Sequence, residues 1–203
     1  MDVDVTVTQI LHEMTRIPAS LKSWRTPVID LLNDNRVFNC NPADANRWRP
    51  IIKTLYDSDK TALPELLGSL LFLLTKIIYQ PSGIGKLTNA PSANIFTNRE
   101  YEMLLRSLNL RRLSYVLFTG EKNHFLTQLP TIQEKLVDIF RGVSSPVVQG
   151  EVFLCIRVLL CRLSPHNLTS FWPVVLTEMV RFPPSLSFHR CEPSGSTGFS
   201  STQ

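Results

Sequence analysis

Three consecutive helical patterns between residues 96 and 163 constrain the fold of this chain more than any other feature. In each pattern, apolar residues recur at intervals of three and four, the period of an α-helix that buries one face. In the first, Thr97 and Glu100 have capping-box spacing, and Gly120 is expected just beyond the helix end. The second begins near Pro130. The chain is therefore expected to fold as packed helices.

The third pattern begins with Ser145 as N-cap and Pro146 as the first helical residue, and it is apolar nearly all round. A helix of this kind is usually buried between neighbours on both sides. Arg157 interrupts it, and an unpaired buried charge is costly. We therefore expect Arg157 to be partly buried and to meet a carboxylate or helix-end carbonyls of another helix.

Helical spacing also covers most of the remaining chain up to residue 181. Valine alternates with polar residues over residues 3–9, which is a strand period, but the spacing from Ile10 onward favours a helix that ends at Pro18. We predict an all-α fold of about seven or eight helices, packed as antiparallel pairs with no sheet. The further helices are expected after caps at Ser20, Asn41 and Ser164 and over residues 62–79.

Four prolines each precede an amphipathic turn, and their spacing indicates the type of helical array. Pro130 and Pro173 are 173 − 130 = 43 residues apart, within the period of about 40 to 47 of HEAT repeats. Pro27 and Pro50 are 50 − 27 = 23 residues apart, nearer one helix and a turn. The pattern predicts an irregular HEAT-like array, an α-solenoid, without a regular repeat.

Residues 1–182 are interpreted as one helical domain with a loop at residues 80–95, which are rich in Gly, Pro, Ser and Asn. Residues 183–203 are rich in Ser, Gly and Pro and are expected to be a disordered tail. Neither end of the domain has a clear polar cap. We therefore expect the chain to be part of a longer array, and to associate with itself or with a partner through apolar contacts.

The chain carries a net charge of +4, which mildly favours anionic partners. Arg106, Arg111 and Arg112 form a positive run without an intervening acid, a candidate contact for anionic lipid headgroups or an acidic partner surface. Alternatively, these arginines lie on a solvated helix flank or cap carbonyl groups at a turn. The second interpretation is favoured because three charges at different helix azimuths produce only a small field.

No arrangement of residues in the sequence indicates catalysis, a metal or a cofactor. His124 and His166 have no second histidine or carboxylate at ligand spacing. The segment around Gly85 and Lys86 lacks the spacing and the hydroxyl of a phosphate-binding loop. The tryptophans lie on apolar helix stripes, which favours core packing over base stacking. We therefore expect a protein that is not an enzyme and binds no cofactor.

The sequence also bears on the cellular compartment. The N-terminus is acidic and lacks the apolar stretch of a signal peptide. The longest apolar run, residues 66–74, is well short of the ~20 residues that a membrane-spanning helix needs. The four cysteines are scattered and form no CxxC motif, which favours free thiols. Any membrane association is expected to be peripheral.

Two long stretches resemble the C-terminal region of the Dopey family. They are RSLNLRRLSYVLFTGEKNHFLTQLPTIQEKLVDIFR and EVFLCIRVLLCRLSPHNLTSFWPVVLTEMV, and the similarity covers about residues 20–181. The most specific parts, LPTIQEKLVD and RLSPHNLTSFWP, are packing motifs that indicate no chemistry. After residue 181 the chain departs from the family, whose last helix continues as an amphipathic segment.

Dopey proteins are very large cytosolic proteins implicated in traffic between Golgi and endosomes. The resemblance implies a scaffold or interaction module in vesicle-mediated protein transport. It also implies peripheral attachment to the cytosolic face of Golgi and endosome membranes. The expected partners are a large scaffold protein related to Arf exchange factors and acidic membrane lipids. The alternative, a basic helical-repeat protein associated with nucleic acid, has only the pI of about 9.0 in its favour, so no nucleic acid is expected.

Overall fold

The computed structural model describes residues 3–78, 93–142 and 145–181, and within these ranges the chain forms helices and no strand. The all-α prediction is therefore confirmed for the described residues. The α-helices are α1 (Val3–Thr15), α2 (Leu21–Asn33), α3 (Pro42–Ser58), α4 (Ala62–Ile78), α5 (Ala93–Thr119), α6 (Leu129–Gly142), α7 (Pro146–Arg162) and α8 (Trp172–Arg181). The 3-10 helices are η1 (Pro18–Ser20), η2 (Asn35–Asn39) and η3 (Pro165–Leu168).

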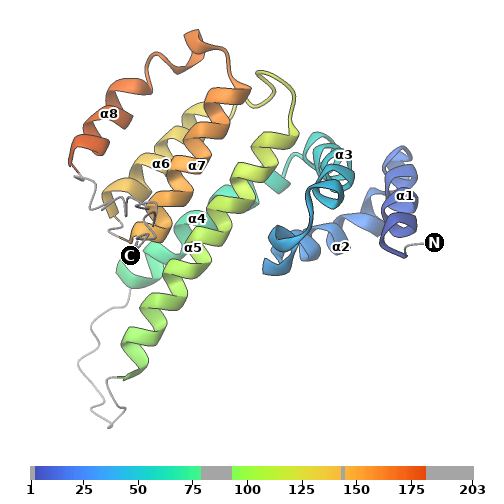
Figure 1. Cartoon of the computed structure of the whole chain (residues 1–203), viewed down its shortest axis with the longest axis horizontal. Helices are drawn as coiled ribbons and strands as arrows, with labels where there is room; N and C mark the ends of the chain where they lie inside the picture. Colours follow the sequence, from blue (N-terminus) through green and yellow to red (C-terminus); the bar gives the residue numbers. More distant parts are fainter. Residues whose placement is uncertain (1–2, 79–92, 143–144, 182–203) are drawn as a thin grey trace, which may run out of the picture.

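The helices stack as an α-solenoid-like array. Helices that follow one another pack together, as α1 with α2, α3 with α4 and α6 with α7. Alternate helices are also in contact: α1 packs against α3, α3 against α5 and α5 against α7. The even-numbered helices α4, α6 and α8 do the same. In Figure 1, α1 to α3 form one end of this array and α8 the other.

Helices α5 and α7 run in the same direction, as alternate helices of a solenoid do. Arg111 of α5 pairs with Glu151 of α7, 40 residues later in the chain. Asn123, just after α5, pairs with Ser164, just after α7, 41 residues later. Because the offset stays nearly constant along both helices, they are parallel, and Figure 1 shows them side by side.

One hydrophobic cluster extends through the array from α2 to α8. Trp24 of α2, Ile51 of α3 and Leu113 of α5 are almost completely buried in it. The predicted apolar face of α6, from Ile132 to Phe140, is also buried there, which confirms that amphipathic pattern. The predicted core packing of the tryptophans is confirmed for Trp24 and wrong for Trp172, which is exposed at the first turn of α8.

The helix ends depart from the prediction at three places. Helix α5 begins at Ala93, so Thr97 lies inside the helix and is not its N-cap; the expected loop at residues 80–95 also overlaps this helix at residues 93–95. The alternating valines from Val3 onward are helical. Ser164 leads into the 3-10 helix η3, and α8 begins only at Trp172, where Pro173 falls in the first turn that proline tolerates. The remainder of the predicted loop and the predicted tail lie outside the described residues.

Helix α7 is not buried on both sides. Its inner face, which includes Val152 and Cys155, is buried, whereas Phe153, Leu154 and Leu160 are exposed. Arg157 lies on the exposed face and forms no ion pair with the described residues, so its predicted burial and pairing are wrong. The apolar pattern led to these wrong predictions because apolar residues lie on the exposed face of α7 as well as on its buried face.

Gly120 ends α5 for a reason other than the one the sequence suggested. Its φ is not positive, so it is not the left-handed residue of a helix C-cap. A Cβ at this position would lie 2.6 Å from Cε2 of Phe125, whose ring packs against the glycine. Glycine is therefore required here by close approach and not by backbone conformation.

Gly120→Ala is expected to lower the free energy of unfolding by about 1–2 kcal/mol, because the added methyl group must displace the buried Phe125 ring. Gly150→Ala is the matched control, since its new methyl group would meet no atom within 4 Å. That control is expected to raise the stability by about 0.5–1 kcal/mol through helix propensity. Urea denaturation measures both, and equal effects of the two variants would contradict the close approach.

Both ends of the array expose apolar side chains. Ile10 and Ile17 are exposed around α1, and Leu176 and Val180 are exposed on α8. Self-association remains a prediction, and these exposed residues around α1 and on α8 are the surfaces at which we expect it. Sedimentation velocity across a micromolar concentration series is expected to reveal association that salt weakens little. A monomer at every concentration would contradict it.

Candidate functional site

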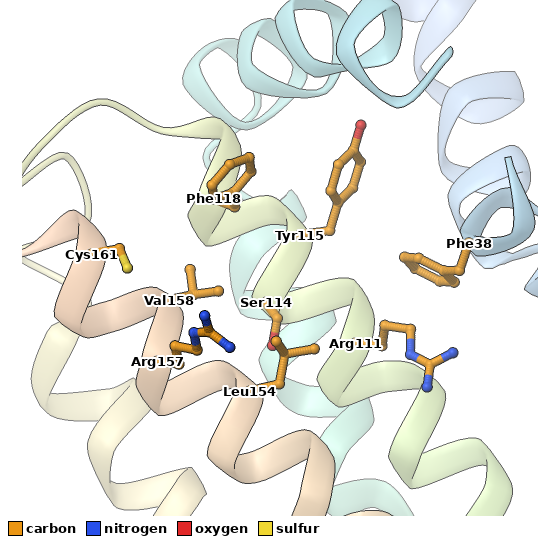
Figure 2. Close-up of a pocket in the computed structure, with 9 residues that line it drawn as sticks. All are labelled: Phe38, Arg111, Ser114, Tyr115, Phe118, Leu154, Arg157, Val158 and Cys161. Atoms are coloured by element: carbon orange, nitrogen blue, oxygen red, sulfur yellow. The ribbon is translucent and has the colours of Figure 1, made fainter. Parts of the chain in front are cut away.

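A groove of about 470 Å³ lies between η2, α5 and α7 on the surface of the array (Figure 2). Helix α5 contributes residues at positions 111, 114, 115 and 118, and α7 contributes residues at 154, 157, 158 and 161. Phe38 of η2 closes the far side. In both helices these positions have the i, i+3, i+4, i+7 spacing of a single helical stripe. Two parallel stripes therefore face each other along about 10 Å of helix.

The groove surface is largely apolar and accessible. Phe118 is 40% exposed and Leu154 is 41% exposed, while Val158 and Phe38 are partly buried. The Phe38 and Tyr115 rings meet edge to face with centroids 6.4 Å apart. The Tyr115 hydroxyl donates a hydrogen bond to the carbonyl of Ala45 at 2.8 Å, which fixes the ring against α3.

Arginines surround this apolar surface. Arg111 lies over the Phe38 ring, 6.0 Å from its centroid, and donates hydrogen bonds to the carboxylate of Glu151. This hydrogen bond raises the pKa of Arg111, so the guanidinium stays charged. Arg157 is exposed within the groove. The residues that line the groove include both of these arginines and no carboxylate.

Two further arginines flank the end of the groove at Phe118. The guanidinium carbon of Arg162 lies 4.3 Å from the centroid of the Phe118 ring, and that of Arg49 lies 4.8 Å from it. Such cation–π contacts hold the aromatic ring in place while it stays accessible to solvent. The Phe118 end of the groove is therefore both apolar and positively charged.

The two cysteines of α7 lie on different faces of the helix. Cys155 is fully buried, and burial raises the pKa of its thiol to about 12. Cys161 is exposed and lines the groove (Figure 2). Both cysteines belong to the apolar pattern of this helix, but only Cys155 lies on its buried face.

The structure separates the three arginines that the sequence grouped. Arg106 is almost completely buried, and burial lowers the pKa of its guanidinium. Arg112 is also buried, and it donates hydrogen bonds to the carbonyls of Leu32 and Asn33 at the end of α2. Arg106 and Arg112 therefore do not form a surface contact for lipid or partner, and only Arg111 reaches the groove.

The alternative interpretation of the arginines, that they cap carbonyl groups, is confirmed for Arg112. The sequence did not identify Phe118, Leu154 and Arg157 as groove-facing residues. The i, i+3, i+4, i+7 stripes to which they belong, one on α5 and one on α7, were visible in the sequence, but nothing distinguished them from inward-facing stripes.

Titratable side chains also meet outside the groove. His124 Nε2 lies 2.7 Å from Asp57 Oδ1, and Lys53 bridges Asp57 and Glu121. This network joins the end of α3 to the segment after α5. Among the described residues, no three His, Cys, Asp or Glu side chains are grouped as a metal site would require. None of the helices in these residues has the length and hydropathy needed to cross a bilayer.

The comparisons with known proteins agree with one another on the family. The sequence model of the family described as DOP1 C-terminal matches residues 1–191. "Protein DOP1 homolog" of Drosophila melanogaster is 38% identical over 173 residues, which are 85% of this chain and 6% of that protein. "Protein pad-1" of Caenorhabditis elegans is 34% identical over 172 residues, again 85% of this chain and 6% of that protein.

The vertebrate "Protein DOP1B" of Mus musculus is 27% identical over 173 residues. No solved structure matches this chain. The chain spans only about 6% of the length of these relatives. The family match over nearly the whole chain agrees with the Dopey resemblance of its packing motifs, and the chain therefore belongs to the DOP1 family.

Proposed function

We propose that this chain is a non-enzymatic interaction module of a DOP1-family scaffold that acts in vesicle-mediated protein transport between Golgi and endosomes. Family membership supports the cellular role. The observation that carries the module's function is the arginine-rimmed apolar groove, because accessible apolar surfaces of this kind are typical of protein interaction sites. The module works by presenting this surface and needs no catalytic group.

The proposed location is the cytosolic face of Golgi and endosome membranes, with peripheral attachment. The proposed partners are a large scaffold protein related to Arf exchange factors and acidic membrane lipids. The net charge of +4 is compatible with an anionic membrane surface. A solenoid is suited to this role because its stacked helices hold an extended surface without a large central core.

The test uses cells that make this protein. Deletion of the coding region for this chain is expected to slow the return of a receptor from endosomes to the Golgi, measured by fluorescence microscopy of a surface-labelled cargo. The control is the same locus restored with the intact sequence. An unchanged return rate after deletion would refute the proposed role.

A second measurement separates the membrane role from the nucleic-acid alternative. The purified chain is incubated with RNA or with liposomes that contain acidic lipids, over a series of salt concentrations. Binding to liposomes and not to RNA is the expected result. Binding to RNA with a steep salt dependence would favour the nucleic-acid interpretation.

A further inference from the structure

We propose that the groove between η2, α5 and α7 binds an acidic amphipathic helix of a partner protein. The inference rests on the proposed function as an interaction module and specifies the chemistry of the partner. The apolar anchors of the partner helix would pack on Phe118, Leu154 and Val158, and its flanking carboxylates would pair with Arg157 and with the arginines at the Phe118 end.

The shape of the groove matches a helix. The two stripes that form it run from residue 111 to residue 118 on α5 and from residue 154 to residue 161 on α7. Such stripes cover about two helical turns, or about 10 Å. A helix with anchors at i, i+3 or i+4, and i+7 presents apolar side chains over the same length. Figure 2 shows Leu154, Val158 and Phe118 following one another along the groove.

The charge of the groove selects an acidic partner. Arg111 and Arg157 line the groove without a lining carboxylate, and Arg49 and Arg162 flank Phe118. Glu151 pairs with Arg111 but leaves Arg157 without an ion pair among the described residues. A partner with carboxylates beside its apolar stripe would complement these charges, whereas a basic amphipathic helix would be repelled.

The placement of the arginines favours a helix over a lipid headgroup. Recognition of one phosphate needs donors that converge on a single point. Here Arg111 is engaged by Glu151, and Arg162 and Arg49 stack on Phe118, so the positive charges are distributed along an apolar surface. Distributed charges of this kind match side chains spaced along a helix.

The direction of the bound helix also follows from the fold. Helices α5 and α7 are parallel, so both C-terminal ends, with their negative dipole ends, lie at the Phe118 and Cys161 end of the groove. A third helix that packs on both is favoured when it runs antiparallel to them. The N-terminal turn of the partner would then lie near Arg162, where acidic residues are favourable for both dipole and ion pairing.

The test measures binding of designed peptides to the full chain by fluorescence anisotropy. The probe is a helical peptide of about four turns with leucines at i, i+3 or i+4, and i+7 and glutamates on both flanks. One control peptide carries lysines in place of the glutamates, and a second has the same composition with the stripe scrambled. The acidic amphipathic peptide is expected to bind at least roughly ten-fold more tightly than either control.

The variants are placed at two exposed positions, so that a loss of binding does not result from a loss of folding. Leu154→Glu and Arg157→Glu are each expected to weaken binding of the acidic peptide by roughly ten-fold. Leu160→Glu is the matched control for the first, because Leu160 lies on the same helix, is 42% exposed and does not line the groove. Arg157→Glu should in addition restore part of the affinity for the lysine peptide.

The cysteines supply an independent readout. Cys161 lines the groove, whereas Cys40 is exposed and does not line it, so the bound peptide should slow alkylation of Cys161 more than that of Cys40. Peptide mapping by mass spectrometry follows each thiol separately. Equal protection of both cysteines, or equal affinities for the three peptides, would overturn the proposal.

A lipid occupant would give a different result. If phosphatidylserine vesicles bound the chain and Leu154→Glu abolished that binding without affecting the peptides, the occupant would be a membrane and the inference would be wrong. Failure of the proposed function is distinguishable: receptor transport would then survive deletion of the chain while the acidic peptide still bound the groove. If deletion slowed transport but no peptide bound, the inference alone would fail.

Discussion

Arg112→Met is expected to lower the free energy of unfolding by about 3 kcal/mol. Arg112 Nε donates to the carbonyl oxygen of Leu32 at 2.9 Å, and its terminal nitrogens bond to Asn33 and to the side chain of Asn109. Methionine fills a similar volume but donates no hydrogen bond, so the carbonyls of Leu32 and Asn33 at the end of α2 would lose their donor. Burial of the charge offsets part of this stabilisation, since it lowers the pKa of Arg112.

The matched control is Arg157→Met, which removes the same side chain from an exposed position. Its stability is expected to change by no more than about 0.5 kcal/mol. Arg112→Lys keeps the charge without the planar fork of donors and is expected to recover only part of the loss. Urea denaturation of the three variants measures the differences. A loss below about 1 kcal/mol in Arg112→Met would show that the buried hydrogen bonds barely exceed the desolvation cost.

Arg106, Arg111 and Arg112 illustrate what sequence could and could not predict. Their charge and helical setting were readable, and capping of carbonyls was among the predicted roles. The groups that Arg112 contacts lie up to 80 residues away, on a different helix. Local periodicity carries no information about such distant partners, so the sequence could not say which arginine is buried.

The same limit explains the groove. Helical periodicity correctly predicted α6 and the ends of α7, because both depend on neighbouring residues and on proline at the first turn. Which stripe of α7 faces outward depends on how α5 and α7 stack, and their contacts join residues 40 apart in the chain. An apolar residue such as Leu154 gives the same sequence pattern whether it lies in a core or in a groove.

The family motifs also acquire a physical role in the structure. Asn123 belongs to the stretch GEKNHF, and Ser164 and Asn167 belong to RLSPHNLTSFWP. The side-chain amide of Asn123 donates to the Ser164 hydroxyl at 2.8 Å and accepts from the Ser164 backbone N–H at 2.8 Å. Its backbone N–H donates to the carbonyl of Arg162, also at 2.8 Å. These bonds join the segment after α5 to the end of α7.

Asn123→Ala is expected to lower the free energy of unfolding by about 3 kcal/mol. Asn123 has a φ of 64°, the left-handed region in which a residue such as alanine costs roughly 1–2 kcal/mol. The substitution also removes the side-chain hydrogen bonds to Ser164 and Asn167, each worth about 0.5–1.5 kcal/mol. Both losses affect the same junction, which ties the segment after α5 to the end of α7.

Asn123→Gly separates the two contributions, because glycine adopts the same φ without strain but cannot make the side-chain bonds. It is expected to lose only about 1–2 kcal/mol, and the exposed His166→Ala control should change by no more than about 0.5 kcal/mol. Thermal and urea denaturation measure the series. Equal losses in the alanine and glycine variants would show that backbone conformation contributes nothing. Near-zero losses in both would show that the register of α5 and α7 is set by apolar packing alone.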